Sequence, residues 1–184
     1  MWANYSTAFR RSPIRSKRVV PGPVDLMKIK ENIREQMGDD WLPDVYAKKV
    51  RPQRTRAVHL DVKERENAAE IQYTLLGIEL KVGKHRFSCP DLATARYMRV
   101  FARIGCRDFA IPYDITKVSA AADLLETSWH RSLILTEEET RGKRAKSVSA
   151  ARSKLIKAMR EALAEIGPGD AMPAFDRETK QRKV

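Results

Sequence analysis

Apolar residues recur every three or four positions in several parts of the chain, which is the spacing that places side chains on one face of a helix. The first such stretch lies between a capping residue, Asp25, and the terminating Gly38, and a shorter one follows at Trp41. The clearest lies between Asp91, a good N-cap, and Gly105, which favours the conformation that ends helices. The sequence therefore predicts helices over 26–37, 41–46 and 92–104.

The C-terminal part of the chain shows the same helical spacing. It predicts one helix over 120–135, capped by Ser119, and a longer one over 138–166 that Gly167 ends. Residues 63–77 are ambiguous, because their apolar positions fit one face of a helix and also alternate as in a strand. Of the two, we predict a helix.

Alternating apolar and polar residues predict four strands. The strands over 78–82 and 85–89 flank a tight turn at Gly83 and form a hairpin. The other two lie over 57–62 and 109–113. We predict an α+β fold, in which a small antiparallel sheet, made of the hairpin plus the last strand, is packed by helices and followed by a helical C-terminal portion.

The chain of 184 residues is long enough for one domain with tails. We predict a basic N-terminal arm over 1–23, a single α+β domain over 24–167 and a basic C-terminal tail over 168–184. The arm segment is rich in Arg and contains no acidic residue. That composition also fits a solvated tail without further function or an organellar transit peptide, so three interpretations of this segment stay open.

Cys89 and Cys106 are the only cysteines, too few for a disulfide framework. The composition therefore favours a reducing compartment, which we expect to be the cytoplasm. No apolar run approaches the roughly 18 residues that a membrane-spanning helix needs, and we expect no membrane partner. No glycine-rich phosphate-binding loop is present, and we expect no cofactor.

Positive charge changes the picture most. The chain has 36 Lys and Arg against 24 Asp and Glu, a net charge of +12, and an excess of this size attracts polyanions. The excess gathers in the arm, in a loop over 48–56, and on one face of each of two predicted helices, where hardly any acid accompanies the arginines. The candidate binding residues are Arg10, Arg11, Arg15, Arg96, Arg99, Arg103, Lys143, Lys146, Lys154 and Lys157.

Basic helix faces of this kind suit a phosphate backbone, because neutralising phosphates releases their counterions. We therefore predict a non-enzymatic nucleic-acid-binding protein, with DNA and RNA both open as partners. No base-reading motif or aromatic stacking platform can be recognised, and a solvated helix face would carry similar charges. A first alternative is a structural subunit of a larger protein or ribonucleoprotein assembly, in which the tails become ordered against neighbours.

A second alternative is a metal-dependent nuclease centred on Glu79 and Lys81, which share one face of a predicted strand. Asp61, Glu64 or Glu70 would have to supply the other carboxylate. The same Glu-x-Lys pattern is common on exposed strands as a simple charge pair. Without a second carboxylate in place, the pattern is only a hypothesis.

A zinc site is possible by composition alone, with ligands from His59, His85, Cys89 and Cys106. The spacing is poor, because His85 and Cys89 would stand about 13 Å apart on one strand. His130 and the serines near it are too close in sequence to face each other on a helix. We therefore predict no metal site and no catalytic residues.

Overall fold

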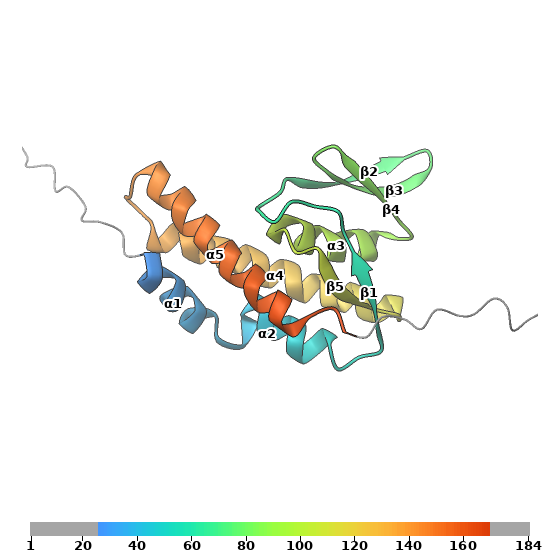
Figure 1. The fold of residues 1–184 in the computed structure, drawn as a ribbon, viewed down its shortest axis with the longest axis horizontal. Helices are drawn as coiled ribbons and strands as arrows, with labels where there is room; N and C mark the ends of the chain where they lie inside the picture. The colour runs from blue at the N-terminus through green and yellow to red at the C-terminus, as the bar shows by residue number, and fades with distance from the viewer. Residues whose placement is uncertain (1–25, 170–184) are drawn as a thin grey trace, which may run out of the picture.

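A computed structural model describes residues 26–169 of the chain (Figure 1). The elements, in order, are α1 (Leu26–Met37), η1 (Gly38–Asp40), α2 (Leu42–Val45), η2 (Tyr46–Val50), β1 (Thr55–His59), β2 (Ala69–Thr74), β3 (Gly77–Val82), β4 (His85–Cys89), α3 (Leu92–Ile104), β5 (Asp108–Pro112), α4 (Ile115–Glu139) and α5 (Ala145–Ile166). None of these helices is both long and apolar enough to cross a membrane. The predicted arm over 1–23, with Arg10, Arg11 and Arg15, and most of the predicted tail lie outside the described residues.

The α+β class is confirmed, and the strands form two small antiparallel sheets. In one, β1 pairs with β5, so that Val58 lies opposite Phe109. In the other, β2, β3 and β4 follow one another as a meander. The strand near Phe109 therefore pairs with β1 and not with the predicted hairpin.

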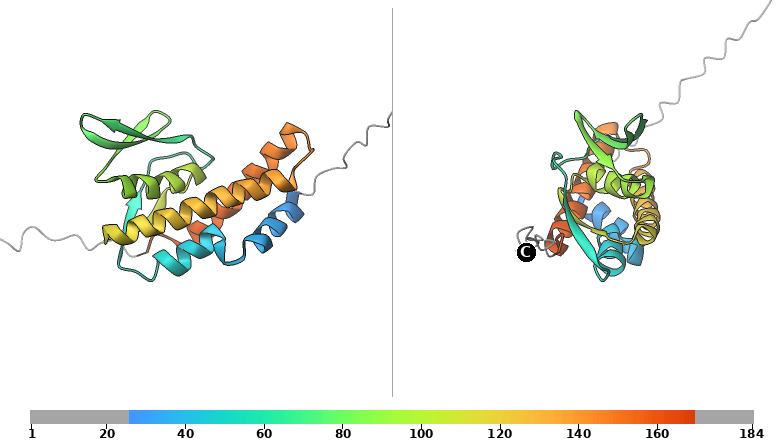
Figure 2. Two further views of the ribbon diagram at one scale, coloured as in Figure 1. Left: turned by 180° about the vertical axis from the view of Figure 1, so that it is seen from behind. Right: turned by 90° about the vertical axis from the view of Figure 1, so that its right-hand side faces the viewer.

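Helix α3 lies between the three-stranded sheet and the other helices, as Figures 1 and 2 show from three directions. Ile71, Leu80 and Phe87 lie opposite one another across the sheet; Leu80 is buried in the apolar core, and the partly buried Ile71 and Phe87 pack against it. On the other side of α3, the long helix α4 packs along it. The predicted caps of α3 are both present: Asp91 accepts a hydrogen bond from the Thr94 amide, and Gly105 is left-handed.

Aromatic side chains fill the centre of the molecule. The rings of Phe101 and Phe109 stack with their centroids 4.2 Å apart. The Tyr97 hydroxyl donates a hydrogen bond to the Ala110 carbonyl at 2.6 Å, and the Tyr46 hydroxyl accepts one from the Ala110 amide at 2.7 Å. Tyr46 also donates to the Gly167 carbonyl beyond α5, so its buried hydroxyl connects β5 with the end of the last helix.

The helix predicted over 63–77 is wrong, because this segment contains strand β2. Ala69 and Ile71 point toward the core, whereas Glu70 between them is exposed, so the period of two decides the structure. Leu75 and Leu76, which supported the helical pattern, lie in the turn between β2 and β3 and are exposed.

The two C-terminal helices also have different limits from those predicted. Helix α4 begins at Ile115, and its cap is Asp114 and not Ser119. The predicted helix over 138–166 is interrupted after Glu139, and α5 starts at Ala145. In the intervening turn Gly142 has a φ of +75°, a conformation that breaks the helical path.

The two cysteines are free and buried. Burial raises the pKa of the Cys106 thiol to about 11, and it also raises that of Cys89. Since alkylating reagents attack the thiolate, we expect neither thiol of the native protein to react with iodoacetamide at pH 8, whereas both react in denaturant. Mass spectrometry of the two samples measures this. Equal labelling rates in both samples would contradict the prediction.

Candidate nucleic-acid interface

The arginine stripe on α3 faces an acidic partner. Arg96 donates to Asp123 at 2.7 Å and to Glu126 at 3.0 Å, both on α4. Arg99 donates to the other carboxylate oxygen of Glu126. The hydrogen bond to Glu126 is the largest cause that raises the pKa of Arg96. The expectation that hardly any acid accompanies these arginines is therefore wrong: the carboxylates come from a different helix.

Arg103 lies one turn further along α3 and has no carboxylate partner among residues 26–169. Burial lowers the pKa of Arg103, and the neighbouring Arg99 adds to this effect. The hollow that it lines also contains Glu66, Glu70 and Arg152. Of the three arginines, Arg103 is the one without an ion pair within residues 26–169, and the hollow beside it contains both acidic and basic side chains.

The basic side chains of α5 behave as predicted in part. Lys146, Lys154 and Lys157 lie on the side of α5 opposite the buried Leu155 and Met159, and we call these three lysines the basic ridge. Lys157 forms an exposed pair with Glu161 at 3.6 Å, one turn along the helix. No carboxylate of the described residues pairs with the other two. Lys143 precedes the helix, in the turn after α4.

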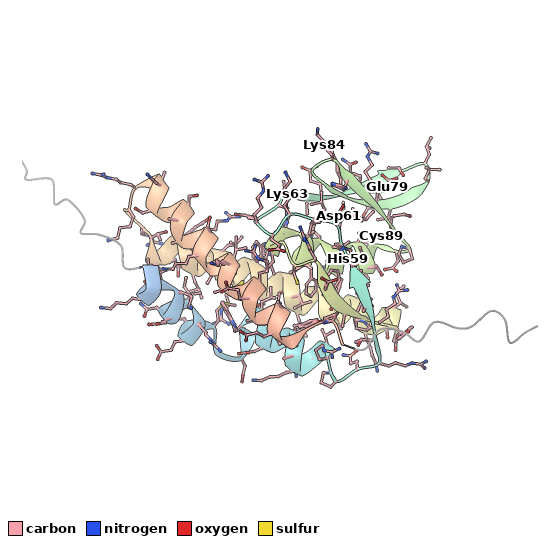
Figure 3. The ribbon with its side chains drawn as sticks, in the orientation of Figure 1. His59, Asp61, Lys63, Glu79, Lys84 and Cys89 are labelled. Atoms are coloured by element: carbon pink, nitrogen blue, oxygen red, sulfur yellow. The ribbon has the colours of Figure 1, made fainter. Side chains whose placement is uncertain are left out.

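A second group of cations, which the sequence did not reveal, surrounds a hollow of about 560 Å³. The loop over 61–68 and the turn between β3 and β4 form its walls. Figure 3 shows Lys63 on the loop and Lys84 on the turn. We call this site the cationic hollow, and its basic residues are Lys63, Arg65, Lys84 and Arg107.

Most of the charge in the cationic hollow is unpaired. Arg107 approaches Glu64 at 3.5 Å, and Glu66 pairs with Arg152 of α5. Lys63, Arg65 and Lys84 have no ion pair with any carboxylate in the part of the chain that the structure describes. The exposed Asp61 is the remaining acidic residue of the lining.

The cationic hollow was not predicted from the sequence because positive and negative residues alternate along the loop. Lys63, Glu64, Arg65 and Glu66 form a neutral run in the sequence. In the fold, however, Glu64 and Glu66 pair with arginines outside the run. The loop is thereby left with two cations facing solvent. No local pattern of the sequence contains this information, because both arginine partners are distant along the chain.

The loop that carries these cations is fixed to the end of α3. The side-chain nitrogen of Asn67, Nδ2, lies within hydrogen-bond distance of three backbone carbonyl oxygens, those of Lys63 at 2.9 Å, Arg65 at 2.8 Å and Ala102 at 3.0 Å. The loop backbone also lies directly against Gly105, where a Cβ atom would be 2.4 Å from the Arg65 carbonyl oxygen. Lys63 and Arg65 are therefore presented from a backbone held at several points.

The nuclease hypothesis requires a second carboxylate close to Glu79 and further ligands for a metal ion. Glu79 on β3 accepts a hydrogen bond from Arg86 at 3.3 Å, and Glu70, which lies opposite Lys81, is only a diagonal neighbour of Glu79 across the sheet. Asp61 belongs to the loop and Glu79 to the sheet (Figure 3). Within residues 26–169, no three His, Cys, Asp or Glu side chains form a group that could hold a metal ion.

The four residues considered for zinc are also distributed over the fold. His59 pairs with Asp108 at 2.7 Å across the two-stranded sheet. In β4, His85 lies opposite Val82 and Cys89 opposite Ile78, at the two ends of the strand.

Comparisons with protein-family models, with curated proteins and with solved structures find no match for this chain. The surface of the molecule itself is thus the basis for a functional proposal.

Proposed function

We propose that this is a non-enzymatic nucleic-acid-binding protein of the cytoplasm that holds phosphates in the cationic hollow and along the basic ridge. The observation that carries the proposal is the presence of three cations, Lys63, Arg65 and Lys84, around a concave surface without carboxylate partners in residues 26–169. The hollow has four cations against the two carboxylates of Asp61 and Glu66, and a concave surface with such an excess of positive charge raises the local density of a polyanion.

The chemistry of the hollow fits phosphate. The guanidinium of Arg65 can donate two parallel hydrogen bonds to phosphate oxygens, and the ammonium groups of Lys63 and Lys84 act as point charges. Because the loop is fixed by Asn67, little ordering is needed on binding. Arg10, Arg11 and Arg15 of the arm would add contacts, whereas Arg96 and Arg99 are left out because Glu126 already engages them.

The proposal predicts that the affinity for nucleic acid falls as the salt concentration rises, and that the cations of the hollow account for a large part of this dependence. Fluorescence anisotropy of labelled single-stranded and duplex oligonucleotides, DNA and RNA, measures affinity as a function of salt. The triple variant Lys63→Ala, Arg65→Ala, Lys84→Ala removes up to three phosphate contacts. On a single strand each contact contributes about 0.7 to the slope of log K against log salt, so we expect the slope to become shallower by about 2.

A matched triple variant controls for the loss of net charge. Lys30→Ala, Arg56→Ala and Lys117→Ala remove the same types and number of cations elsewhere, and these three also have no carboxylate partner in the described residues. We expect this variant to keep the slope of the wild type to within about 0.5. An affinity of the wild type that does not fall with salt would refute nucleic-acid binding, and equal losses in both variants would refute the hollow as its site.

A further inference from the structure

The turn between β2 and β3 exposes a group of large apolar side chains. Thr74 lies opposite Gly77, so the turn consists of two residues, Leu75 and Leu76. Leu75 is fully exposed, Leu76 is 91% exposed, and Tyr73 beside them is 72% exposed. We call these three residues the apolar tip. Such an exposed group of apolar side chains is a mark of an interaction site.

The fold does not require leucine at this turn. None of the described non-glycine residues has a positive φ, so Leu75 and Leu76 have ordinary backbone conformations, and Gly77, with φ at +118°, takes the position that disfavours a side chain. Here the local geometry is maintained by the neighbours: the Thr74 hydroxyl donates to the Gly77 carbonyl at 3.1 Å and accepts from the Leu76 amide at 3.2 Å. Large apolar side chains that are exposed at a turn that does not require them point to an interaction surface.

The apolar tip and the cationic hollow occupy opposite ends of one sheet. Strand β3 starts at Gly77, next to the tip, and ends at Val82, which lines the hollow. Five residue steps along a strand span about 17 Å. Figure 1 shows the turn between β2 and β3 and the turn between β3 and β4 at opposite ends of the meander, which lies on one side of α3. Strand β3 therefore sets the distance between Lys84, at the hollow, and the tip, and this distance equals about five stacked nucleotides at 3.4 Å each.

The area of the tip argues against a second copy of this chain as its occupant. Complete burial of Tyr73, Leu75 and Leu76 removes on the order of 500 Å² per molecule, whereas a stable dimer needs about 800 Å² from each partner. The tip is also narrow and convex, two residues wide at its end. A shape of this kind inserts between surfaces, as apolar wedges do between base steps of nucleic acids.

Resting on the proposed function, we propose that the apolar tip inserts among the bases of a single-stranded nucleic acid whose phosphates lie in the cationic hollow. The Tyr73 ring stacks on an unpaired base, and Leu75 and Leu76 separate neighbouring bases. A single strand is the partner because its bases are open to the tip without the disruption of base pairs. The tip supplies the base-contacting element that the sequence lacked.

Two variants test the tip with a 12-nucleotide single strand that carries a 2-aminopurine base, whose fluorescence rises on unstacking. The double variant Leu75→Ser, Leu76→Ser is expected to bind about tenfold more weakly than the wild type, with an unchanged salt slope. The wild type is expected to raise the fluorescence of the bound strand, and the variant is not. A trinucleotide is too short to reach both sites, so its affinity should be the same for both proteins.

Tyr73→Thr is a second tip variant, and threonine keeps the preference of this position for a β-strand. Ile134→Ser, which removes an exposed apolar side chain of α4, is the matched control. Circular dichroism verifies that all of them fold. If wild-type binding does not depend on salt, the proposed function fails. If binding depends on salt but tip variants match the wild type in affinity and fluorescence, the insertion fails while the function stands. If the tip variants change only the sedimentation of the protein, the tip is a protein interface and the insertion is overturned.

Discussion

Replacement of Gly105 by alanine is expected to destabilise the protein by about 4 kcal/mol. A Cβ atom at this position would lie 2.4 Å from the Arg65 carbonyl oxygen, 2.6 Å from the Arg65 amide nitrogen and 2.7 Å from the Lys63 carbonyl oxygen. All three are backbone atoms, so the loop must move away as a whole. The left-handed backbone, with φ at +76°, adds about 1 kcal/mol for any residue with a side chain.

Gly142→Ala separates these two contributions. Gly142 has nearly the same φ, +75°, but no atom lies within 4 Å of the position of its Cβ. We expect this control to lose about 1 kcal/mol only. Thermal denaturation should show a fall in Tm of about 10 °C for Gly105→Ala and about 3 °C for Gly142→Ala. Equal losses would mean that the close approach of the loop is unimportant. Displacement of the loop should also reduce the salt dependence of nucleic-acid binding.

Glu126→Ala is the second large expected effect, a loss of about 2 kcal/mol in the free energy of unfolding. Its carboxylate is 11% exposed and receives hydrogen bonds from both Arg96 and Arg99. Removal leaves Arg99 without a carboxylate partner in the described residues, and the Nε of Arg99 already lacks a hydrogen bond. An unpaired charge in a largely buried site costs about 3 kcal/mol or more, and the partial exposure of the two arginines reduces this.

Glu161→Ala is the control for Glu126→Ala. Glu161 and its partner Lys157 are both exposed, so the loss should stay below about 0.5 kcal/mol. Urea denaturation of the two variants measures the difference in the free energy of unfolding. A loss for Glu126→Ala no larger than that for Glu161→Ala would show that the contact between α3 and α4 does not depend on this ion cluster.

Local signals predicted the elements whose ends are encoded nearby. Asp91 caps α3 and Gly105 ends it, both as the sequence indicates. The hairpin of β3 and β4 follows from alternation around Gly83, and the apolar face of α1 is buried at Ile29 and Ile33. In each case the deciding interactions lie within a few residues of one another, where spacing and capping preferences act.

The predictions that proved wrong concern features that depend on contacts between distant parts of the chain. Leu75 and Leu76 completed an apolar pattern that favoured a helix, but a pattern cannot distinguish apolar residues of the core from apolar residues exposed at a turn. Likewise, the partner of β5 is β1, which precedes it by about fifty residues. Pairing over such a separation leaves no local trace in the sequence.

In the candidate site, too, the sequence alone did not predict which charged side chains are free of ion pairs. Arg96 and Arg99 formed the clearest basic stripe of the sequence, yet Asp123 and Glu126 of α4 neutralise them because α4 packs along α3. Lys63 and Arg65 belonged to a run of alternating charge, and the fold releases them by pairing the acidic residues elsewhere. Net charge along the chain predicted a polyanion partner, but which cations are free depends on contacts between distant segments.

The meander of β2, β3 and β4 has its principal contacts with a single element outside itself, α3. A lobe connected in this way can open as a unit at a lower free energy than the helical core. A single-stranded nucleic acid bound both to the loop over 61–68 and to the apolar tip would connect the lobe, which opens, to the loop, which is fixed to α3. The protection of the lobe's amide protons against exchange would then rise with the concentration of free strand, so that occupancy of the site is recorded in the dynamics of the sheet.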